Sequence, residues 1–185
     1  MTQTTLPDSF NWCLSTLGCA ELDLEASLSL AATYGIGALE LRALEDALDL
    51  PAYFGQNFGS PEILCKKIAQ SKVRIAVLDT SLKLIDSDTQ DREAFLKFIP
   101  WAEAMGTPYL RVFDGGSATV QGDKSQLDKA AETANWWQKL RAHNGWQVDI
   151  AMETHDAICS AKDCLAFEAR LDAPCPLIWD AHHTF

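Results

Sequence analysis

The sequence lacks several features that would place the protein in a well-defined class. No run of Lys or Arg is visible, and 15 basic residues are outnumbered by 26 acidic ones, which gives a formal net charge of -11. Such a charge repels nucleic-acid phosphates and anionic membrane surfaces. No apolar stretch approaches the roughly 20 residues that span a bilayer, and the first ten residues lack the pattern of a secretory signal. We therefore expect a cytoplasmic protein without nucleic-acid or membrane partners.

Closely spaced cysteine pairs and a glycine-rich turn are also missing. The six cysteines include no CxxC pair and are scattered through the chain, so we expect reduced, partly buried thiols rather than disulfides or structural zinc. The first apolar run is followed by Ser15-Thr-Leu-Gly-Cys-Ala20. A doubly wound nucleotide-binding sheet normally carries a glycine-rich turn at this point, so its absence weakens that interpretation.

The sequence does contain a sixfold alternation of short apolar runs with longer segments of helical periodicity. This pattern is typical of βαβ crossovers and a parallel sheet. At 185 residues the chain is long enough for one well-buried core, so we predict a single domain over residues 1–185. The predicted strands cover residues 12–17, 38–42, 74–79, 109–114, 148–153 and 177–180.

Helical patterns lie between these strands. Pro100 should kink one predicted helix, because proline removes a backbone hydrogen bond. Ser160 and Asp163 fit a capping box that opens the last predicted helix. The segment 56–60 is interpreted as a connecting loop, with a lid as the alternative. The predicted helices lie within residues 23–35, 61–71, 91–105 and 124–143, and begin again at 160.

Periodicity leaves two architectures open, an open doubly wound sheet and an eight-unit barrel without its last two units. In a barrel, functional residues gather at the C-terminal ends of the strands, where the βα loops converge. Carboxylates and imidazoles in such a place favour a divalent metal site. The alternative is a purely structural role, in which the same groups cap helices or form ion pairs. The strand-end polar residues are Glu40, Arg42, Asp79, Arg111, Asp114, Glu153, His155, Asp180, His182 and His183.

Several of these segments resemble the xylose isomerase-like barrel superfamily, which includes ketose 3-epimerases, inosose dehydratases, hydroxypyruvate isomerases and the zinc endonuclease IV group. The resemblance implies an α/β fold, a TIM (β/α)8-type barrel truncated at its C-terminus to about six βα units. The residues that carry it are Ala38-Leu-Glu-Leu-Arg42, Leu110-Arg-Val-Phe-Asp-Gly-Gly116, Glu153 and the D-x-x-H element Asp180-Ala-His-His183.

The same resemblance implies a function and a ligand set. Glu153, Asp180 and His183 would be metal residues, with Glu153 doubling as an acid/base and His183 also able to contact substrate. The divalent metal would be Mn, Mg, Co or Zn, held weakly or absent, because the family's two remaining ligands follow the seventh and eighth strands. The expected reaction is isomerisation or epimerisation of a small sugar or sugar phosphate, with the metal polarising a carbonyl.

Further residues are candidate substrate contacts, and rival functions stay open. One rival is a catalytically incomplete fragment that binds a sugar or another subunit. DNA repair of the endonuclease IV kind is less favoured, because Asp79 and Asp114 stand near positions where that group uses histidines. Open sheet edges on the first and sixth strands predict a homo-oligomer that covers them. The candidate substrate contacts are His183, Glu40, Arg42, Arg111, His155 and Trp12.

Overall fold

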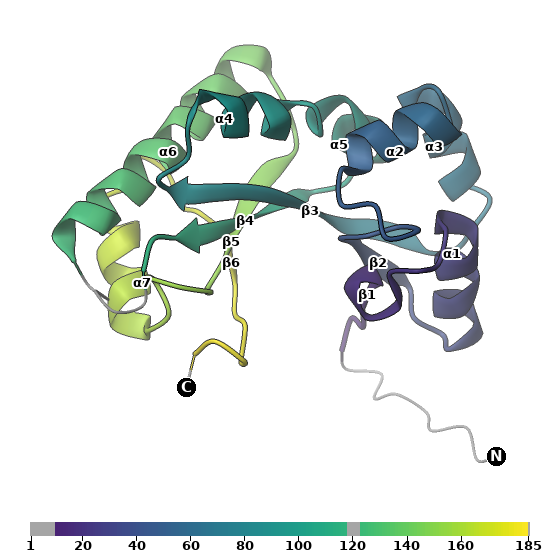
Figure 1. Ribbon diagram of the computed structural model, residues 1–185, viewed down its shortest axis with the longest axis horizontal. Coiled ribbons are helices and arrows are strands. Elements are labelled where there is room, and N and C mark those ends of the chain that lie inside the picture. The colour runs from purple at the N-terminus through teal and green to yellow at the C-terminus, as the bar shows by residue number, and fades with distance from the viewer. Residues whose placement is uncertain (1–9, 118–122, 185) are drawn as a thin grey trace. The chain divides into compact units, whose positions relative to one another are not determined.

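A computed structural model describes residues 10–117 and 123–184 (Figure 1). The chain divides into two compact units, Met1–Ala76 and Val77–Phe185, which we call the N-terminal and C-terminal units. Each is described by itself, and the prediction of a single domain over residues 1–185 stays a prediction. Within the described ranges, no helix combines the length and apolar character that a membrane crossing requires.

The N-terminal unit contains two short parallel strands, with Leu14 opposite Leu39 and Ser15 opposite Glu40. The Asp23 side chain caps the first helix by accepting a hydrogen bond from the Ala26 backbone N–H at 2.7 Å. The elements of this unit are β1 (Leu14–Ser15), a 3-10 helix (Thr16–Cys19), α1 (Leu24–Thr33), β2 (Ala38–Leu41), α2 (Leu50–Asn57) and α3 (Pro61–Ile68).

Two predictions for the N-terminal unit are wrong. The first strand is shorter than residues 12–17, because the Ser15 side chain caps the 3-10 helix that begins at Thr16. The supposed loop over 56–60 begins with the last two residues of helix α2, which the sequence interpretation missed. The signals for this helix were present, since Asp49 accepts from the Ala52 N–H as an N-cap and Pro51 lies in the first turn.

The C-terminal unit places most of β3, and β4, β5 and β6, side by side in chain order, with every neighbouring pair parallel (Figure 1). Helices connect the first three of these strands to the next, so the predicted parallel α/β organisation is confirmed. The elements are β3 (Arg74–Ile85), α4 (Thr89–Leu96), α5 (Ile99–Met105), β4 (Tyr109–Gly115), α6 (Lys124–Asn144), β5 (Asp149–Glu153), α7 (Ala161–Glu168) and β6 (Leu177–Ile178).

Helices α4 and α5 replace the single helix predicted over residues 91–105. Helix α4 starts earlier, through a reciprocal capping box between Asp88 and Asp91. The predicted kink at Pro100 is a complete break, and the proline occupies the first turn of α5. A proline ring clashes with the carbonyl four residues before it and cannot donate its own hydrogen bond, so a new helix begins instead.

Strand β3 runs six residues further than predicted, to Ile85. Asp79 pairs with Arg111 of β4, and the next register pair is Lys83 with Phe113, so β3 carries an irregularity equivalent to a β-bulge. Asp79 and Arg111 therefore lie inside their strands, and their assignment to strand ends is wrong. The bulge matters for the site because it removes the β3 backbone from regular pairing next to Asp79.

The core of the C-terminal unit is centred on Trp137 of α6, which is 1% exposed. Its ring meets Phe95 edge-on, with centroids 5.2 Å apart, and stacks on Trp146 at 5.7 Å. Its indole N–H donates to Asp149 Oδ1 at 2.9 Å, so the one polar atom of the side chain is satisfied where it is buried. This contact ties α6 to the start of β5 and fixes the strand whose far end is Glu153.

Candidate functional site

Arg111 forms ion pairs with two carboxylates from neighbouring strands. Its Nη2 lies 2.9 Å from Asp79 Oδ2 on β3, and its Nε lies 3.1 Å from Glu153 Oε2 on β5. The side chains of Arg111 and Asp79 are only 4% and 5% exposed, and that of Glu153 is 16% exposed. One guanidinium thus faces two carboxylates in a place with little solvent, where charged groups need partners.

Thr80, in the bulge of β3, completes the arginine's surroundings. Its carbonyl oxygen accepts from Arg111 Nη1 at 3.0 Å, and its hydroxyl donates to the Arg111 carbonyl at 2.8 Å. Arg111 Cζ lies over the Phe113 ring, 3.9 Å from its centroid. A stacked arginine with directed hydrogen bonds has little rotational freedom left, so this side chain is held rigidly.

Three histidines and Phe113 form a contiguous group beside Glu153. The His155 ring meets the Phe113 edge at 4.9 Å and lies over the His183 ring, with centroids 3.9 Å apart and an interplanar angle of 35°. His182 meets His183 edge-on at 4.9 Å. His155 Nδ1 lies 3.3 Å from Asp156 Oδ2. The sequence predicted His155 as a substrate contact and His183 as a metal residue that can also contact substrate, and the structure places the two rings in contact.

Glu153, His155 and His183 bring one potential ligand atom each within 4.8 Å of one another, and among the described residues they form the one such group of three. Zinc lies about 2.0–2.2 Å from nitrogen and oxygen ligands, so tetrahedral ligands sit roughly 3.4 Å apart. A small inward movement of the three side chains would therefore match a bound dication. Mixed carboxylate and imidazole donors also suit zinc, cobalt and manganese. The residues present fit a divalent metal.

Asp180, the other predicted ligand, lies next to this cluster. Its Oδ2 is 3.7 Å from His183 Nε2, and its Oδ1 accepts from the His182 backbone N–H at 2.7 Å. Its own backbone N–H donates to Thr154 Oγ1 at 3.0 Å, which ties the segment after β6 to the end of β5. Asp180 thus shapes the turn that presents His183, and its ligation of a metal stays a prediction.

Asp114 is fully buried and accepts hydrogen bonds from backbone groups. Its oxygens take the N–H groups of Gly115 at 2.8 Å, Asp156 at 2.9 Å and Ile158 at 2.6 Å. Burial raises the pKa of Asp114, against these N–H groups, which lower it. Two of the three donors belong to the loop after β5, so Asp114 fixes the loop that carries His155. Gly115 and Gly116 have φ angles of 70° and 74°, a left-handed backbone that favours glycine.

Three predicted substrate contacts, Glu40, Arg42 and Trp12, belong to the N-terminal unit. Glu40 is half-buried on β2, and the Arg42 backbone N–H after β2 donates to Thr16 Oγ1 at 2.9 Å. Trp12 is 41% exposed and lies 5.6 Å from the Phe10 ring. Their roles toward a substrate stay predictions.

Phe113 and Thr80 are parts of the site that the sequence interpretation missed. Phe113 had a usable signal, because residues two apart on a strand share a face and Arg111 was already a candidate. It also pairs in register with Glu153. Thr80 had no local signal, since its role depends on the bulge in β3.

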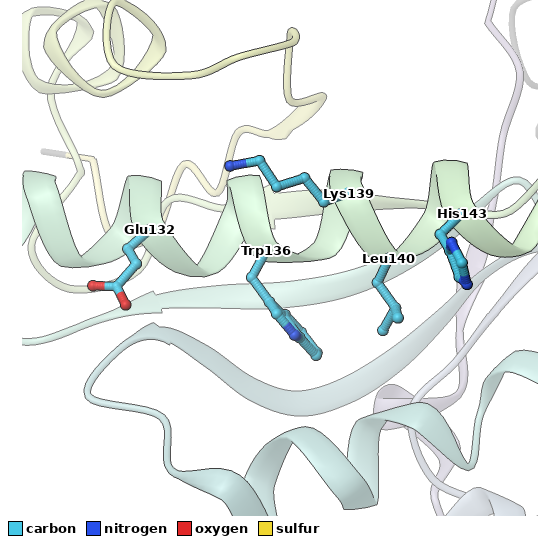
Figure 2. Close-up of a pocket in the computed structure, with 5 residues that line it drawn as sticks. All are labelled: Glu132, Trp136, Lys139, Leu140 and His143. Carbon is cyan, nitrogen blue, oxygen red and sulfur yellow. The ribbon is translucent and has the colours of Figure 1, made fainter.

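A pocket outside this cluster lies along helix α6 (Figure 2). It has a volume of about 450 Å³ and is lined by Glu132, Trp136, Lys139, Leu140 and His143. Figure 2 shows Trp136 and Leu140 extending from the same side of the helix, with Lys139 directed away from them. Arg92 covers the Trp136 ring at 4.7 Å. The lining is half-buried or exposed and includes none of the metal-type residues described above.

Comparison with solved structures identifies the architecture. The structure of the probable 3-DHS dehydratase AsbF from Bacillus anthracis matches 92% of the chain with a TM-score of 0.72 at 14% identity. A xylose isomerase domain containing protein from Salmonella typhimurium LT2 matches 90% of it with a TM-score of 0.70 at 12% identity. The chain has the xylose isomerase-like TIM-barrel fold. The fold class implied by the resemblance is therefore confirmed.

The similarity to xylose isomerase-like proteins is seen in the structure, and it covers only part of each compared protein. The IolI protein, whose crystal structure holds a zinc atom, matches 95% of the chain with a TM-score of 0.70 at 13% identity. The chain spans 62%, 64% and 59% of the AsbF, IolI and Salmonella structures, about three-fifths of each. No protein-family model matches the sequence, and no curated protein does either.

Proposed function

We propose that this protein is a divalent-metal-dependent isomerase or epimerase of a small sugar, and that Glu153, His155 and His183 hold the metal. The observation that carries the proposal is the convergence of these three donor groups within 4.8 Å. Carboxylate and imidazole groups are typical ligands of divalent metals, and their clustering at a half-buried position is typical of a functional site. The cluster therefore supports metal binding.

The low exposure of the carboxylates also supports a built site. Arg111 contacts Asp79 and Glu153, and both side chains are largely shielded from solvent. Buried carboxylates are normally paired or coordinate a metal. The zinc atom in the IolI structure supports the choice of a divalent cation.

A bound metal would act as a Lewis acid that polarises the sugar carbonyl. In the proposed isomerisation, Glu153 would accept the proton from the carbon next to that carbonyl and return it to the carbonyl carbon, while the hydroxyl proton on the first carbon moves to the former carbonyl oxygen, so the enzyme ends unchanged. His155 and His183 would orient hydroxyl groups on the same face of the sugar. Arg111 and Asp114 would keep the glutamate and the His155 loop in place.

Metal titration of the purified chain tests this proposal. We expect Mn²⁺, Co²⁺ or Zn²⁺ to bind with a stoichiometry of one in isothermal calorimetry, and Glu153→Gln and His183→Ala to lose most of the affinity. His143→Ala is the matched control, because this exposed histidine near the end of α6 lies outside the cluster. Absence of binding in the wild type would overturn the metal site.

The reaction is tested by incubating the metal-loaded chain with a panel of ketoses and their phosphates and following epimer formation by NMR. Turnover that disappears in Glu153→Gln supports the isomerase. Metal and sugar binding without turnover would instead favour the sugar-binding module, a rival that gains weight because the chain spans about three-fifths of the compared structures. Cleavage of abasic DNA would support the endonuclease alternative.

A further inference from the structure

Every nitrogen of the Arg111 guanidinium has a partner from a neighbouring strand. Nε faces Glu153 at 3.1 Å, Nη2 faces Asp79 at 2.9 Å, and Nη1 donates to the Thr80 carbonyl at 3.0 Å. A planar guanidinium whose three nitrogens all have partners, and which lies against the Phe113 ring, cannot rotate without losing several contacts at once. Through Arg111, the position of Glu153 Oε2 is therefore fixed relative to strands β3 and β4.

The strand register explains why these residues meet. Asp79 lies directly opposite Arg111, whereas Glu153 lies opposite Phe113, two residues further along β4. The arginine side chain is long enough for Nη2 to contact Asp79 directly opposite and for Nε to contact Glu153, its diagonal neighbour. The bulge after Asp79 leaves the Thr80 carbonyl beside Arg111, where it accepts a hydrogen bond from Nη1.

A second arginine in the same unit shows what an ordinary structural ion pair looks like. Arg141 Nη1 lies 3.1 Å from Asp149 Oδ2, at the opposite end of β5 from Glu153. Its Nε donates to the Val148 carbonyl at 2.9 Å, and its side chain is 30% exposed. Arg141 anchors the same strand but contacts none of the three residues of the metal-type cluster, so it offers a control for loss of an arginine near β5.

We propose that Arg111 and Asp79 are positioning residues that hold the Glu153 carboxylate in one orientation toward His155 and His183. In this role Arg111 acts through Glu153 rather than on a substrate, and Asp79 keeps the arginine in place. The inference rests on the proposed function for the identity of the bound group, but the fixed orientation itself exists in the metal-free protein. The two can therefore be tested separately.

The metal-free test uses the Nε–Hε signal of Arg111 in ¹⁵N-labelled protein. A guanidinium fixed between two carboxylates should give a resolved, slowly exchanging signal that shifts in Glu153→Gln and in Asp79→Asn. The Arg141 signal should stay unchanged in both variants. An Arg111 signal that exchanges as fast as that of a solvent-exposed arginine would overturn the proposal, whether or not the protein binds metal.

The metal test compares Co²⁺ affinity and the visible Co²⁺ spectrum in four variants. Residues that orient metal ligands typically change affinity by about 10–100-fold when they are replaced. We expect a loss of this size and an altered spectrum in Arg111→Met, a smaller loss in Asp79→Asn, and partial recovery in Arg111→Lys. Arg141→Met should lower the melting temperature while its affinity and spectrum remain those of the wild type.

The outcomes separate the two proposals. A folded Arg111→Met protein with wild-type Co²⁺ affinity and spectrum would overturn the positioning role while leaving the metal site intact. A wild-type protein that binds no Co²⁺ would overturn the proposed function, and the Nε–Hε signal would then decide the positioning role alone. If Arg111→Met fails to fold, Asp79→Asn and Arg111→Lys supply the same comparison with smaller changes in volume.

Discussion

The two units use their polar residues in different ways. In the N-terminal unit, recorded polar contacts mostly end helices and shape turns: Thr16 Oγ1 accepts from the backbone after β2, and the Tyr53 hydroxyl donates to Glu45 at 2.9 Å. In the C-terminal unit, Arg111 links side chains from three adjacent strands. Residues at facing positions of consecutive strands can bring charged side chains together in the interior. Side chains in turns instead form hydrogen bonds with nearby backbone groups. The comparison locates the candidate chemistry in the C-terminal unit.

The cysteines of the C-terminal unit are also more buried than those of the N-terminal unit. Cys13 is exposed and Cys19 and Cys65 are half-buried, whereas Cys159, Cys164 and Cys175 of the C-terminal unit are all buried. All six are free thiols, as predicted for a chain without paired cysteine motifs. Burial raises the pKa of Cys159 to about 11 and that of Cys175 to about 12. The C-terminal unit thus excludes solvent from positions where the N-terminal unit admits it.

Trp137→Ala should have the largest effect on stability. The substitution removes a buried indole and leaves Asp149 without one of its hydrogen-bond donors, so we expect a loss of about 3–5 kcal/mol in the free energy of unfolding. Urea unfolding followed by circular dichroism measures it. Metal affinity of the folded fraction should be unchanged, and a loss below 1 kcal/mol would show that the core is not centred where we place it.

Cys175 should be far less reactive than Cys13. Burial raises its pKa from an ordinary 9.0 to about 12, which lowers its thiolate fraction about a thousandfold at neutral pH. Mass spectrometry after timed iodoacetamide treatment of the folded protein should find Cys13 modified first and Cys175 last. Rapid modification of Cys175 without denaturant would contradict the burial contrast between the units.

The same shift predicts a loss of stability in alkali. Because the folded protein keeps Cys175 protonated to a higher pH than the unfolded chain does, its contribution is complete below pH 9.0 and decreases as the pH rises toward about 12. Cys175→Ala should flatten this part of the curve of unfolding free energy against pH. An equally steep alkaline decline in the variant would assign it to other groups.

Glu153→Gln and Glu40→Gln form a matched pair across the two units. Both replace one strand glutamate by its neutral isostere, but only Glu153 belongs to the metal-type cluster found among the described residues. We expect Glu153→Gln to weaken metal binding about a hundredfold or more and Glu40→Gln to leave it within about twofold. Calorimetric titration measures both. Equal losses would break the comparison by giving the N-terminal unit a share in metal binding.

Asp46→Gly should have the smallest effect. Asp46 has a φ of 61°, a left-handed conformation that costs a side-chain-bearing residue about 1 kcal/mol. Its backbone N–H, which donates to the Ala20 carbonyl at 2.8 Å, is kept by glycine. We expect a slight gain in melting temperature, because the greater entropy of unfolded glycine offsets part of the relief. A clear destabilisation would show that the Asp46 side chain has a role in this turn.

Several parts of the site were predictable because their signals are local. An apolar strand followed by Glu153, and an apolar pair followed by Asp180 and His183, are patterns that can be read within a few residues. The contact between His155 and His183 was not predictable in this way, because it depends on how the segment after β6 folds back toward the end of β5.

The sequence by itself determined the alternation of six apolar strands with helical segments, the cap at Ser160, and the parallel α/β class. These follow from hydrophobic periodicity and from cap residues, which act over one or two turns of chain. Only the tertiary structure decided that β3 continues past a bulge, and that Arg111 contacts carboxylates from two neighbouring strands. Register between strands 32 to 42 residues apart in the chain is set by packing of whole elements, which no local pattern specifies.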